Sequence, residues 1–516
     1  MTWTRRWLVG FFGAALALHL VGCTGAPPAR EAAREAPAPP TPRDGPDYHA
    51  LWLATGPGGK LYTVMLEQLP RGASIVFRRS SDYGATAQAP TRIMTIDQSA
   101  VALSFPWMAL DGKEGIYLAW RWKTPAHKRL YFSRSLDDGR TWQEPRILTD
   151  REPFAPILDV TRAGRVSVLW QDEVRATRDL NLTLSDDSGA TWLENPIRLT
   201  AAHVPKGTQV FAHRLVSDQS GRIYVIWYQR GLRPLSRDLV LTRSFDLGKS
   251  WLPQPDTLRS IPDPEGPGIY NPMLVAGPGG QLFAGWEERD QKTGWRLLLK
   301  RSTDGGITWT QEPILVNTPL GTRGIARRFR LATDGKGRLY AAWTEKLDDR
   351  QRVAFRRSTD AGASWDPVRY LDGETPTHSV SETPWVVPDE DGRVFVAWQH
   401  WQGRREVGWR IFFTRSDDSG ATWLPEPVRL DTLPQRTAGV RPLQLLSDGR
   451  GAVYVAWRND PFGKRDYFLN KSTDYGTTWL PKEQWLTDPS TVHSGQAAVR
   501  RDPADGGSPR SKGKPQ

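Results

Sequence analysis

The sequence predicts an all-β protein, a β-propeller of four-stranded antiparallel blades. One motif, S-x-D-x-G-x-[ST]-W, recurs through the 516 residues at intervals of 50 to 59 residues. An alternating strand ending in Trp, such as IYLAW to Trp120, precedes the second and later copies by 15–18 residues. Four short strands in each repeat, repeated many times, are typical of propeller blades.

The number of motif copies sets the expected number of blades. The full copies begin at Ser135, Ser185, Ser244, Ser302, Ser358, Ser416 and Ser472. A partial copy from Ser80 ends in Ala87 where the others have Trp, and Met65 replaces the strand Trp in the same repeat. Eight repeats predict eight blades. The alternative is seven blades, with the degenerate first repeat displaced or its strands shared.

The motif has the composition of a hairpin turn. Its Asp is expected to accept hydrogen bonds from turn amides, and its Gly to supply a positive φ angle. Its Trp should fold back onto the blade as an apolar anchor. The motif Asp residues are therefore predicted to be structural rather than catalytic: Asp82, Asp137, Asp187, Asp246, Asp304, Asp360, Asp418 and Asp474.

The repeats also account for most of the 24 Trp residues. Seven end a second strand: Trp120, Trp170, Trp227, Trp286, Trp343, Trp398 and Trp457. Seven close a motif: Trp142, Trp192, Trp251, Trp309, Trp365, Trp423 and Trp479. Those left outside the pattern, and so expected to be free to stack on a sugar or partner, are Trp122, Trp295, Trp401, Trp409 and Trp485.

The chain ends indicate export and a lipid anchor. Residues 1–22 combine a basic start with an apolar stretch of signal-peptide length. They lead to Leu20-Val21-Gly22-Cys23, which resembles the lipobox of bacterial lipoproteins and implies lipidation of Cys23. Residues 23–46 are then a Pro/Ala-rich tether, 47–495 the propeller and 496–516 a basic disordered tail. Thr24 after the cysteine resembles outer-membrane sorting, so the protein is expected to be lipid-anchored there.

A single Cys allows no intrachain disulfide, and eight scattered His residues show no metal-ligand spacing. We therefore expect neither a metal nor a cofactor. The formal charge of +12 favours anionic partners, although the basic residues are spread over all repeats. Nucleic acid is not an expected partner, because the chain carries no recognised binding motif.

The recurring motif resembles the Asp-box, or BNR repeat, of the sialidase superfamily. The resemblance covers the whole of 47–495 and implies a propeller with the boxes on its outer rim, away from a central pocket. Asp-boxes occur in proteins of several activities, so they specify architecture better than function. The fifth repeat contains IYNPMLVAGPGGQLFAGWEER, which resembles the sialidase segment commonly written [FY]RIP. Pro272 matches its Pro, and Glu287 or Glu288 its later acid, but Tyr270 replaces its substrate-binding Arg.

Candidate site residues follow from aligning the innermost strands on a recurring Pro. With Arg214 and Arg330 placed in the Pro column, the positions equivalent to Tyr270 are Ser104, Phe154, Ala212, Arg328, Glu382 and Val440. Tyr270 and Glu382 are the candidate catalytic residues. The candidate ligand-binding residues are Arg328, Arg330, Arg214, Arg441 and Glu287. Sialidases bind the carboxylate of their sugar with three Arg residues, because guanidinium groups make bidentate contacts with carboxylates. Only one Arg occupies the aligned position in this sequence.

Three functions remain open from these residues. The first is a membrane-anchored propeller that binds a glycan or protein ligand at its mouth and serves as a scaffold. The second is an exported glycoside hydrolase, resembling an exo-α-sialidase or a glucanase, which would need suitably spaced carboxylates or a Tyr–Glu pair near the axis. The third is an assembly factor for a membrane complex. Whether the protein is an enzyme stays undecided.

Overall fold

The computed structural model describes residues 47–96, 102–103, 106–124, 127–174, 177–200, 208–232, 235–262, 268–373, 378–403, 408–432, 444–459 and 465–487. The predicted signal peptide, Cys23, the tether, the tail and Arg441 lie outside the described residues. The described residues are strands, turns and one short 3₁₀ helix, η1 (Pro278–Gly280). None of the described helical residues forms a segment with the length and apolar character needed to span a membrane.

The strands form repeated four-stranded antiparallel units, which we number 1 to 8 in chain order. Unit 1 comprises β1 (Asp47–Gly56), β2 (Lys60–Gln68), β3 (Ala73–Ser80) and β4 (Thr91–Ile96), and unit 2 comprises β5 (Ala102–Leu103) with β6 (Trp107–Leu110), β7 (Ile116–Lys123), β8 (Lys128–Ser135) and β9 (Arg146–Thr149). Unit 3 comprises β10 (Pro153–Val160), β11 (Val166–Val174), β12 (Thr177–Ser185) and β13 (Ile197–Arg198). Unit 4 comprises β14 (Gln209–Ser217), β15 (Ile223–Leu232), β16 (Leu235–Ser244) and β17 (Asp256–Pro262).

Units 5 to 8 repeat the same order. Unit 5 comprises β18 (Ile269–Ala276), β19 (Leu282–Asp290), β20 (Gly294–Ser302) and β21 (Ile314–Leu315), and unit 6 comprises β22 (Ile325–Thr333), β23 (Leu339–Leu347), β24 (Arg350–Ser358) and β25 (Arg369–Tyr370). Unit 7 comprises β26 (Val380–Pro388), β27 (Val394–Trp401), β28 (Trp409–Ser416) and β29 (Val428–Arg429). Unit 8 comprises β30 (Gln444–Ser447), β31 (Val453–Asn459), β32 (Asp466–Ser472) and β33 (Gln484–Trp485). A single parallel bridge, Gln351 with Val380, links units 6 and 7. The predicted β-propeller of antiparallel four-stranded blades is therefore confirmed.

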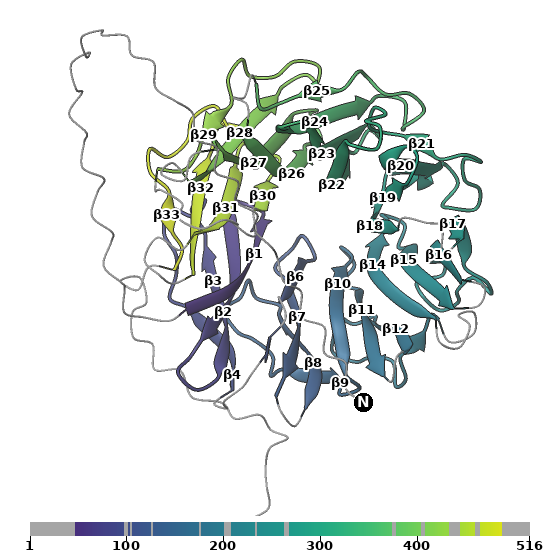
Figure 1. Cartoon of the computed structure of the whole chain (residues 1–516). Coiled ribbons are helices and arrows are strands. Elements are labelled where there is room, and N and C mark those ends of the chain that lie inside the picture. The colour runs from purple at the N-terminus through teal and green to yellow at the C-terminus, as the bar shows by residue number, and fades with distance from the viewer. Residues whose placement is uncertain are drawn as a thin grey trace, which may run out of the picture. The chain divides into compact units, whose positions relative to one another are not determined.

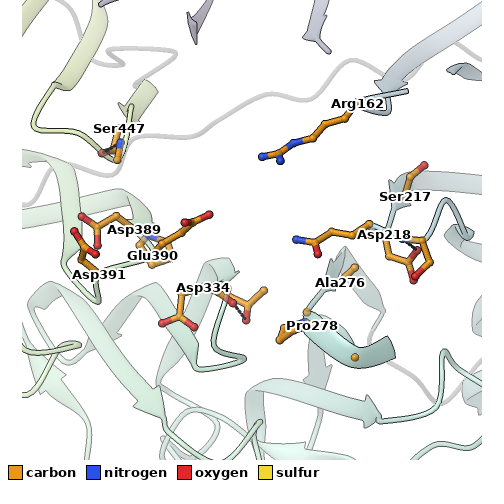
Figure 2. A pocket seen from close by; sticks show the side chains of 18 of the residues that line it. Arg162, Ser217, Asp218, Ala276, Pro278, Asp334, Asp389, Glu390, Asp391 and Ser447 are labelled. Carbon is orange, nitrogen blue, oxygen red and sulfur yellow. Dashed lines mark hydrogen bonds between the residues drawn. The ribbon is translucent and has the colours of Figure 1, made fainter. Parts of the chain in front are cut away.

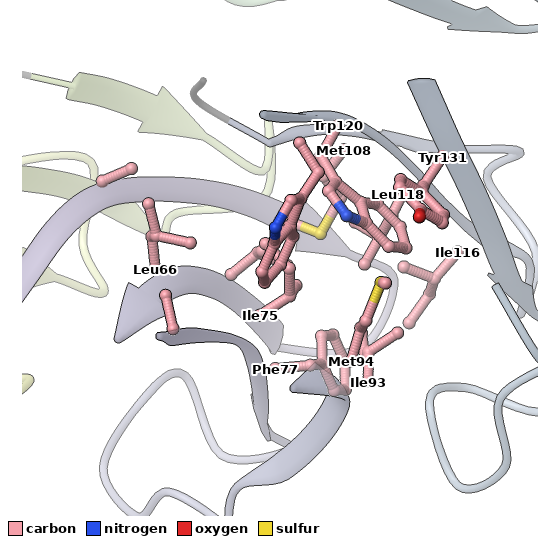
Figure 3. Close-up of a cluster of buried hydrophobic side chains, with 14 of the residues drawn as sticks. Leu66, Ile75, Phe77, Ile93, Met94, Met108, Ile116, Leu118, Trp120 and Tyr131 are labelled. Carbon is pink, nitrogen blue, oxygen red and sulfur yellow. The ribbon is translucent and has the colours of Figure 1, made fainter. Parts of the chain in front are cut away.

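The units follow one another around a common centre, with the first strand of each unit innermost (Figure 1). Each pair of successive units shares a cluster of buried apolar side chains. One such cluster joins β2, β3 and β4 of unit 1 to β6, β7 and β8 of unit 2 and includes Phe77 and Trp120 (Figure 3). Burial of apolar surface between neighbouring units is the main stabilising contribution in this arrangement.

The first and last units also pack together. Leu53 and Leu61 of unit 1 share a buried cluster with Tyr454 of unit 8. The Gln444 side chain in β30 accepts a hydrogen bond from the main-chain N–H of Leu53 at 3.0 Å. Contacts between units therefore extend from the last unit described back to the first.

The second-strand Trp residues are at most 1% exposed, and Met65 is fully buried at the same position of unit 1. Each Trp faces the preceding unit: Trp170 of unit 3, for example, packs with Phe132 of unit 2. The prediction that these Trp residues build the blades is confirmed. The prediction that Trp122 is free to stack on a ligand was wrong, because this residue is 2% exposed within the cluster between units 1 and 2.

The box turns have one hydrogen-bonding pattern, illustrated by the second copy. Asp137 accepts hydrogen bonds from the N–H and hydroxyl of Thr141, and from the Ser135 hydroxyl. These bonds outweigh burial and lower the pKa of Asp137 to about 2. The Gly139 N–H donates to Ser135 Oγ, and Gly139 has a φ of 77°. The predicted structural role of the motif Asp residues agrees with this geometry.

The box Trp residues do not fold onto their own blade, as the sequence suggested, but onto the preceding one. Trp142 of unit 2 meets Phe77 of unit 1 edge to face at 4.9 Å, and Trp479 of unit 8 meets Phe413 of unit 7 at 4.7 Å. The box Gly is part of the same contact, since a Cβ on Gly139 would lie 2.4 Å from the Phe77 ring. Each such box thus joins two units.

Candidate functional site

The innermost strands share a β-bulge that sets the geometry of the site. In β10, β14, β18, β22 and β26 the pairing with the second strand shifts at one place. The residues with positive φ at these bulges are Ala155, Ala212, Asn271, Arg328 and Thr383. A bulge bends its strand and redirects the side chains beside it, which is why bulges often border functional sites.

The bulge corrects the alignment that the recurring Pro suggested. Tyr270 pairs with Glu287 just before the bulge of β18, and the residue in that place in β22 is Arg327, paired with Thr344. Arg328 is therefore equivalent to Asn271, one position later. The alignment was wrong by one residue in units 4 and 6, because His213 and Phe329, not Arg214 and Arg330, occupy the Pro column. Phe211 is correspondingly the equivalent of Tyr270 in unit 4, where the alignment placed Ala212.

A cavity of about 710 Å³ lies at the start of three neighbouring inner strands, β18, β22 and β26. It is lined by Tyr270, Asn271, Glu287, Ile325, Arg327, Arg328, Arg330, Thr344, Lys346, Gln351, Glu382 and Thr383. Five of the residues singled out from the sequence therefore meet here. Arg214 is not among the lining residues, and Arg441 lies outside the described residues.

Arg328 and Glu382 form an ion pair across two units. Arg328 Nη2 lies 3.2 Å from Glu382 Oε2, with 37% and 18% of the two side chains exposed. Gln351 Nε2 also reaches the same carboxylate oxygen at 3.5 Å. A pair this exposed contributes little to stability, so both groups are available to a ligand at small energetic cost.

Arg327 is a site residue that the sequence alignment missed. Its guanidinium lies over the Trp295 ring at 4.8 Å, and its Nε is 4.0 Å from Glu287 Oε2. The Tyr270 ring contacts the same indole with a centroid distance of 5.6 Å. More than half of the Arg327 side chain is exposed, so it presents a positive charge at the rim of the cavity. The adjacent basic pair Arg327-Arg328 was the only sequence signal for it.

Glu287 holds the two bulges together. Its Oε1 accepts hydrogen bonds from the Asn271 side chain at 2.9 Å and from the Phe329 main-chain N–H at 2.9 Å, and the residue is 3% exposed. Glu288 turns to the opposite side, where it pairs with Arg259 and Arg296. Both acids that matched the later acid of the [FY]RIP segment therefore have extensive partners within the protein.

Two arginines lie deeper along the inner strands. Arg330 of β22 lies over the Trp385 ring at 4.6 Å. Burial lowers its pKa from the ordinary Arg value, and the charges of Arg214 and Arg328 lower it further. Burial also lowers the pKa of Arg214, whose guanidinium donates to the His213 carbonyl at 2.9 Å. Among the described residues, neither Arg330 nor Arg214 has a carboxylate within 4 Å.

The charges of the cavity do not balance. Arg327, Arg328, Arg330 and Lys346 face two carboxylates, those of Glu287 and Glu382. The lining thus carries an excess of two positive charges in a partly enclosed space, where a charge is less screened than on an open surface. An anion is the ligand that this imbalance favours. The described residues contain no group of His, Cys, Asp and Glu side chains suited to hold a metal ion.

The arrangement contains part of what a Tyr–Glu nucleophile would require. Tyr270 is 42% exposed in the same cavity as Glu382. A nucleophilic hydroxyl needs an adjacent base to take its proton. Within the described part of the chain, the carboxylate of Glu382 is held by Arg328 and Gln351 rather than by the Tyr270 hydroxyl. The catalytic role assigned to Tyr270 and Glu382 stays a prediction.

A second cavity, of about 740 Å³, lies at the other ends of the inner strands, among the turns that lead to the second strands (Figure 2). Arg162 reaches into the space between these turns. The acids here are mainly turn residues: Asp218 and Asp334 each accept hydrogen bonds from two amides of their own turn. None of the candidate site residues that the structure describes lies in this second cavity, whose recurring Asp residues maintain the turns.

Fold and cavity together define the class of protein, an Asp-box β-propeller whose inner-strand cavity is basic. Residues 221–425 and 340–505 match the model of the BNR repeat-like domain, and these matches span more than half of the chain. The chain belongs to the BNR repeat-like family.

Solved structures of low sequence identity resemble the chain. A polysaccharide lyase is 10% identical with a TM-score of 0.46, covering 71% of this chain and 89% of the lyase. The α-L-arabinanase of Penicillium chrysogenum is 18% identical with a TM-score of 0.36, covering 63% and 94%. A Hadza microbial sialidase is 18% identical with a TM-score of 0.33, covering 68% and 63%. The search of curated proteins found no match.

Proposed function

We propose that this protein is a membrane-anchored propeller that binds an acidic glycan at the cavity formed by β18, β22 and β26. The observation that carries the proposal is the excess of positive charge there, with Arg327 and Arg328 exposed at the rim. Guanidinium groups bind carboxylate and sulfate groups with paired hydrogen bonds. The formal charge of +12 adds a long-range attraction for such ligands.

Binding is favoured over catalysis because the carboxylates of the cavity are engaged. Glu287 is buried and holds main-chain and side-chain N–H groups. Glu382 is paired with Arg328. A glycoside hydrolase would need one of them as an acid, base or nucleophile. Hydrolysis remains the second candidate function because Tyr270 and Glu382 line one cavity.

The test is a panel of oligosaccharides of one length bearing uronates, sulfates or no charge, titrated into the purified full chain. We expect binding of charged members only, weakened by salt and reduced at least about tenfold in Arg327→Ala/Arg328→Ala. Arg140→Ala/Lys249→Ala removes the same two positive charges from exposed box turns and is the matched control. Equal binding of neutral members would contradict the proposal, and release of product from any member would favour the hydrolase.

The anchor is a separate part of the proposal. The single cysteine, Cys23, follows an apolar segment and Leu20-Val21-Gly22, and the proposed lipid on Cys23 would hold the propeller at the outer membrane. Membrane fractionation of the unmodified chain and of Cys23→Ser tests this. We expect the unmodified chain with the membranes and the variant in the soluble fraction. An unchanged distribution of Cys23→Ser would contradict lipid anchoring.

A further inference from the structure

The position just before each inner-strand bulge has a different chemistry on the two sides of the cavity. In chain order, from β10 to β26, this position is occupied by Phe154, Phe211, Tyr270, Arg327 and Glu382. All five lie near the starts of their strands, as does the basic cavity. Three aromatic residues in units 3, 4 and 5 are thus followed by the charged residues of units 6 and 7.

The three aromatic residues are partly exposed to solvent. Phe154 is 39% exposed and Tyr270 42% exposed, and Phe211 is half-buried. Exposed aromatic surface is unfavourable in water, so a run of it beside a charged cavity indicates a binding surface. Their inner strands contact one another in the order β10, β14, β18. The three residues therefore occupy equivalent positions on three neighbouring inner strands that lead to the cavity, and we call them the aromatic arc.

Neighbouring side chains hold the rings in place. Phe211 stacks on Tyr228, its partner across the sheet, at 5.5 Å and 26°. Tyr270 contacts Trp295, on which Arg327 also lies. The Arg121 guanidinium lies over the Phe154 ring at 5.4 Å. A ring that is already ordered loses little conformational entropy when a ligand covers it.

We propose that the ligand is a chain of several sugars rather than a single acidic sugar, a proposal that rests on the proposed function. One uronate or sulfate group binds at Arg327 and Arg328, and the sugars next to it lie along Tyr270, Phe211 and Phe154. A pyranose ring has an apolar C–H face and polar edges. An aromatic ring can cover that face while the hydroxyl groups stay in water. The arc would thereby select for chain length, and the arginines for charge.

The experiment titrates the purified full chain with oligogalacturonates of two, four and six sugars. We expect the affinity of the unmodified protein to rise about tenfold or more between two and six sugars. In Phe154→Ala/Phe211→Ala the affinity for the disaccharide should be unchanged and the gain with length lost. Phe245→Ala, which removes an exposed ring from a box turn, is the control and should keep the gain. Thermal unfolding of each variant establishes that it is folded.

The outcomes separate the two proposals. Binding that is charge-dependent but independent of length would overturn the inference of a chain-binding surface and leave the basic cavity as the site. A gain with length that persists in Phe154→Ala/Phe211→Ala would overturn the aromatic arc as its source. Failure of every length to bind would contradict both.

Discussion

Arg328 and Glu382 join the inner strands of units 6 and 7 through an ion pair of 3.2 Å at the cavity rim. Glu382 thereby neutralises one of the cations that we propose as ligands for a glycan anion. Glu382→Gln keeps the shape of the side chain and removes its charge. We expect this variant to bind an acidic oligosaccharide several-fold more tightly, because Arg328 is released and repulsion of the ligand is removed.

Titration calorimetry of Glu382→Gln with oligogalacturonate measures this effect, and Arg328→Ala provides the opposite change in charge. The hydrolase alternative predicts a different result. If Glu382 acts in catalysis, Glu382→Gln abolishes product release without tightening binding. Weaker binding of the acidic ligand by Glu382→Gln would contradict the assignment of Glu382 as a competitor for Arg328.

Glu287 and Glu382 line one cavity but should respond differently to substitution. Glu287→Ala leaves the Phe329 N–H and the Asn271 amide without their acceptor. A buried polar group without its partner costs about 1–3 kcal/mol, so the free energy of unfolding should fall by at least that amount. Denaturant unfolding measures it. Glu287→Gln, which keeps an acceptor oxygen, should lose less, and Glu382→Ala should change stability little. Equal losses for Glu287→Ala and Glu382→Ala would contradict the bracing role of Glu287.

Gln444 connects the last unit to the first. Its side-chain oxygen accepts from the Leu53 N–H at 3.0 Å, and Gln444 is 8% exposed. Gln444→Ala should lower the free energy of unfolding by about 1–3 kcal/mol, because that N–H stays buried without an acceptor. Hydrogen exchange should then be faster in β1 and β30 than in β18 and β22. Uniform acceleration over all units would contradict a local role at this junction.

His213 should make stability depend on pH. The ring is buried between β10 and β14, where its Nε2–H donates to the Ala155 carbonyl at 2.7 Å. Burial lowers its pKa to about 4. Because the folded pKa is below the unfolded value of about 6.5, its contribution is complete above pH 6.5 and is lost as the pH falls toward 4.

The measurement compares unfolding free energies of the unmodified protein and His213→Phe between pH 7 and 4. Phe329 occupies the equivalent position of β22, so Phe is compatible with this backbone. The unfolding free energy of the unmodified protein minus that of His213→Phe should fall by up to about 1.4 kcal/mol per pH unit as the pH falls. Subtraction removes contributions such as that of Asp159, whose pKa is raised by burial. A difference that is constant with pH would show that His213 does not titrate as inferred.

The sequence was sufficient to predict the fold because the same pattern of strands and turns recurs in every repeat. The box turns and the buried Trp at each second strand recur at nearly constant spacing, and both have the same structural role in the units that contain them. The contacts between units could not be predicted from the repeats in the same way. The packing of Trp142 onto Phe77 depends on the angle between neighbouring sheets, which no single repeat encodes.

The site was predicted in part. Tyr270, Arg328 and Glu382 were expected in neighbouring repeats and do line one cavity. Arg327 was missed because β22 has Phe329 where β18 has Pro272, and the comparison anchored on Pro placed Arg330 in that column instead. Glu287 matched an acid of the resembled segment, but its burial and its two N–H partners are properties of the folded chain.

The most direct test of the central claim is the affinity of the full chain for hexagalacturonate and for the same hexasaccharide with its carboxylates reduced to alcohols. The two ligands differ only at C6 of each sugar, where the acidic form has a carboxylate and the reduced form has an uncharged hydroxymethyl group. We predict that the acidic form binds and that the reduced form binds at least tenfold more weakly, with the difference lost in Arg327→Ala/Arg328→Ala. Equal affinity for the two forms, or a difference that survives the loss of both arginines, would contradict an acidic-glycan site at this cavity.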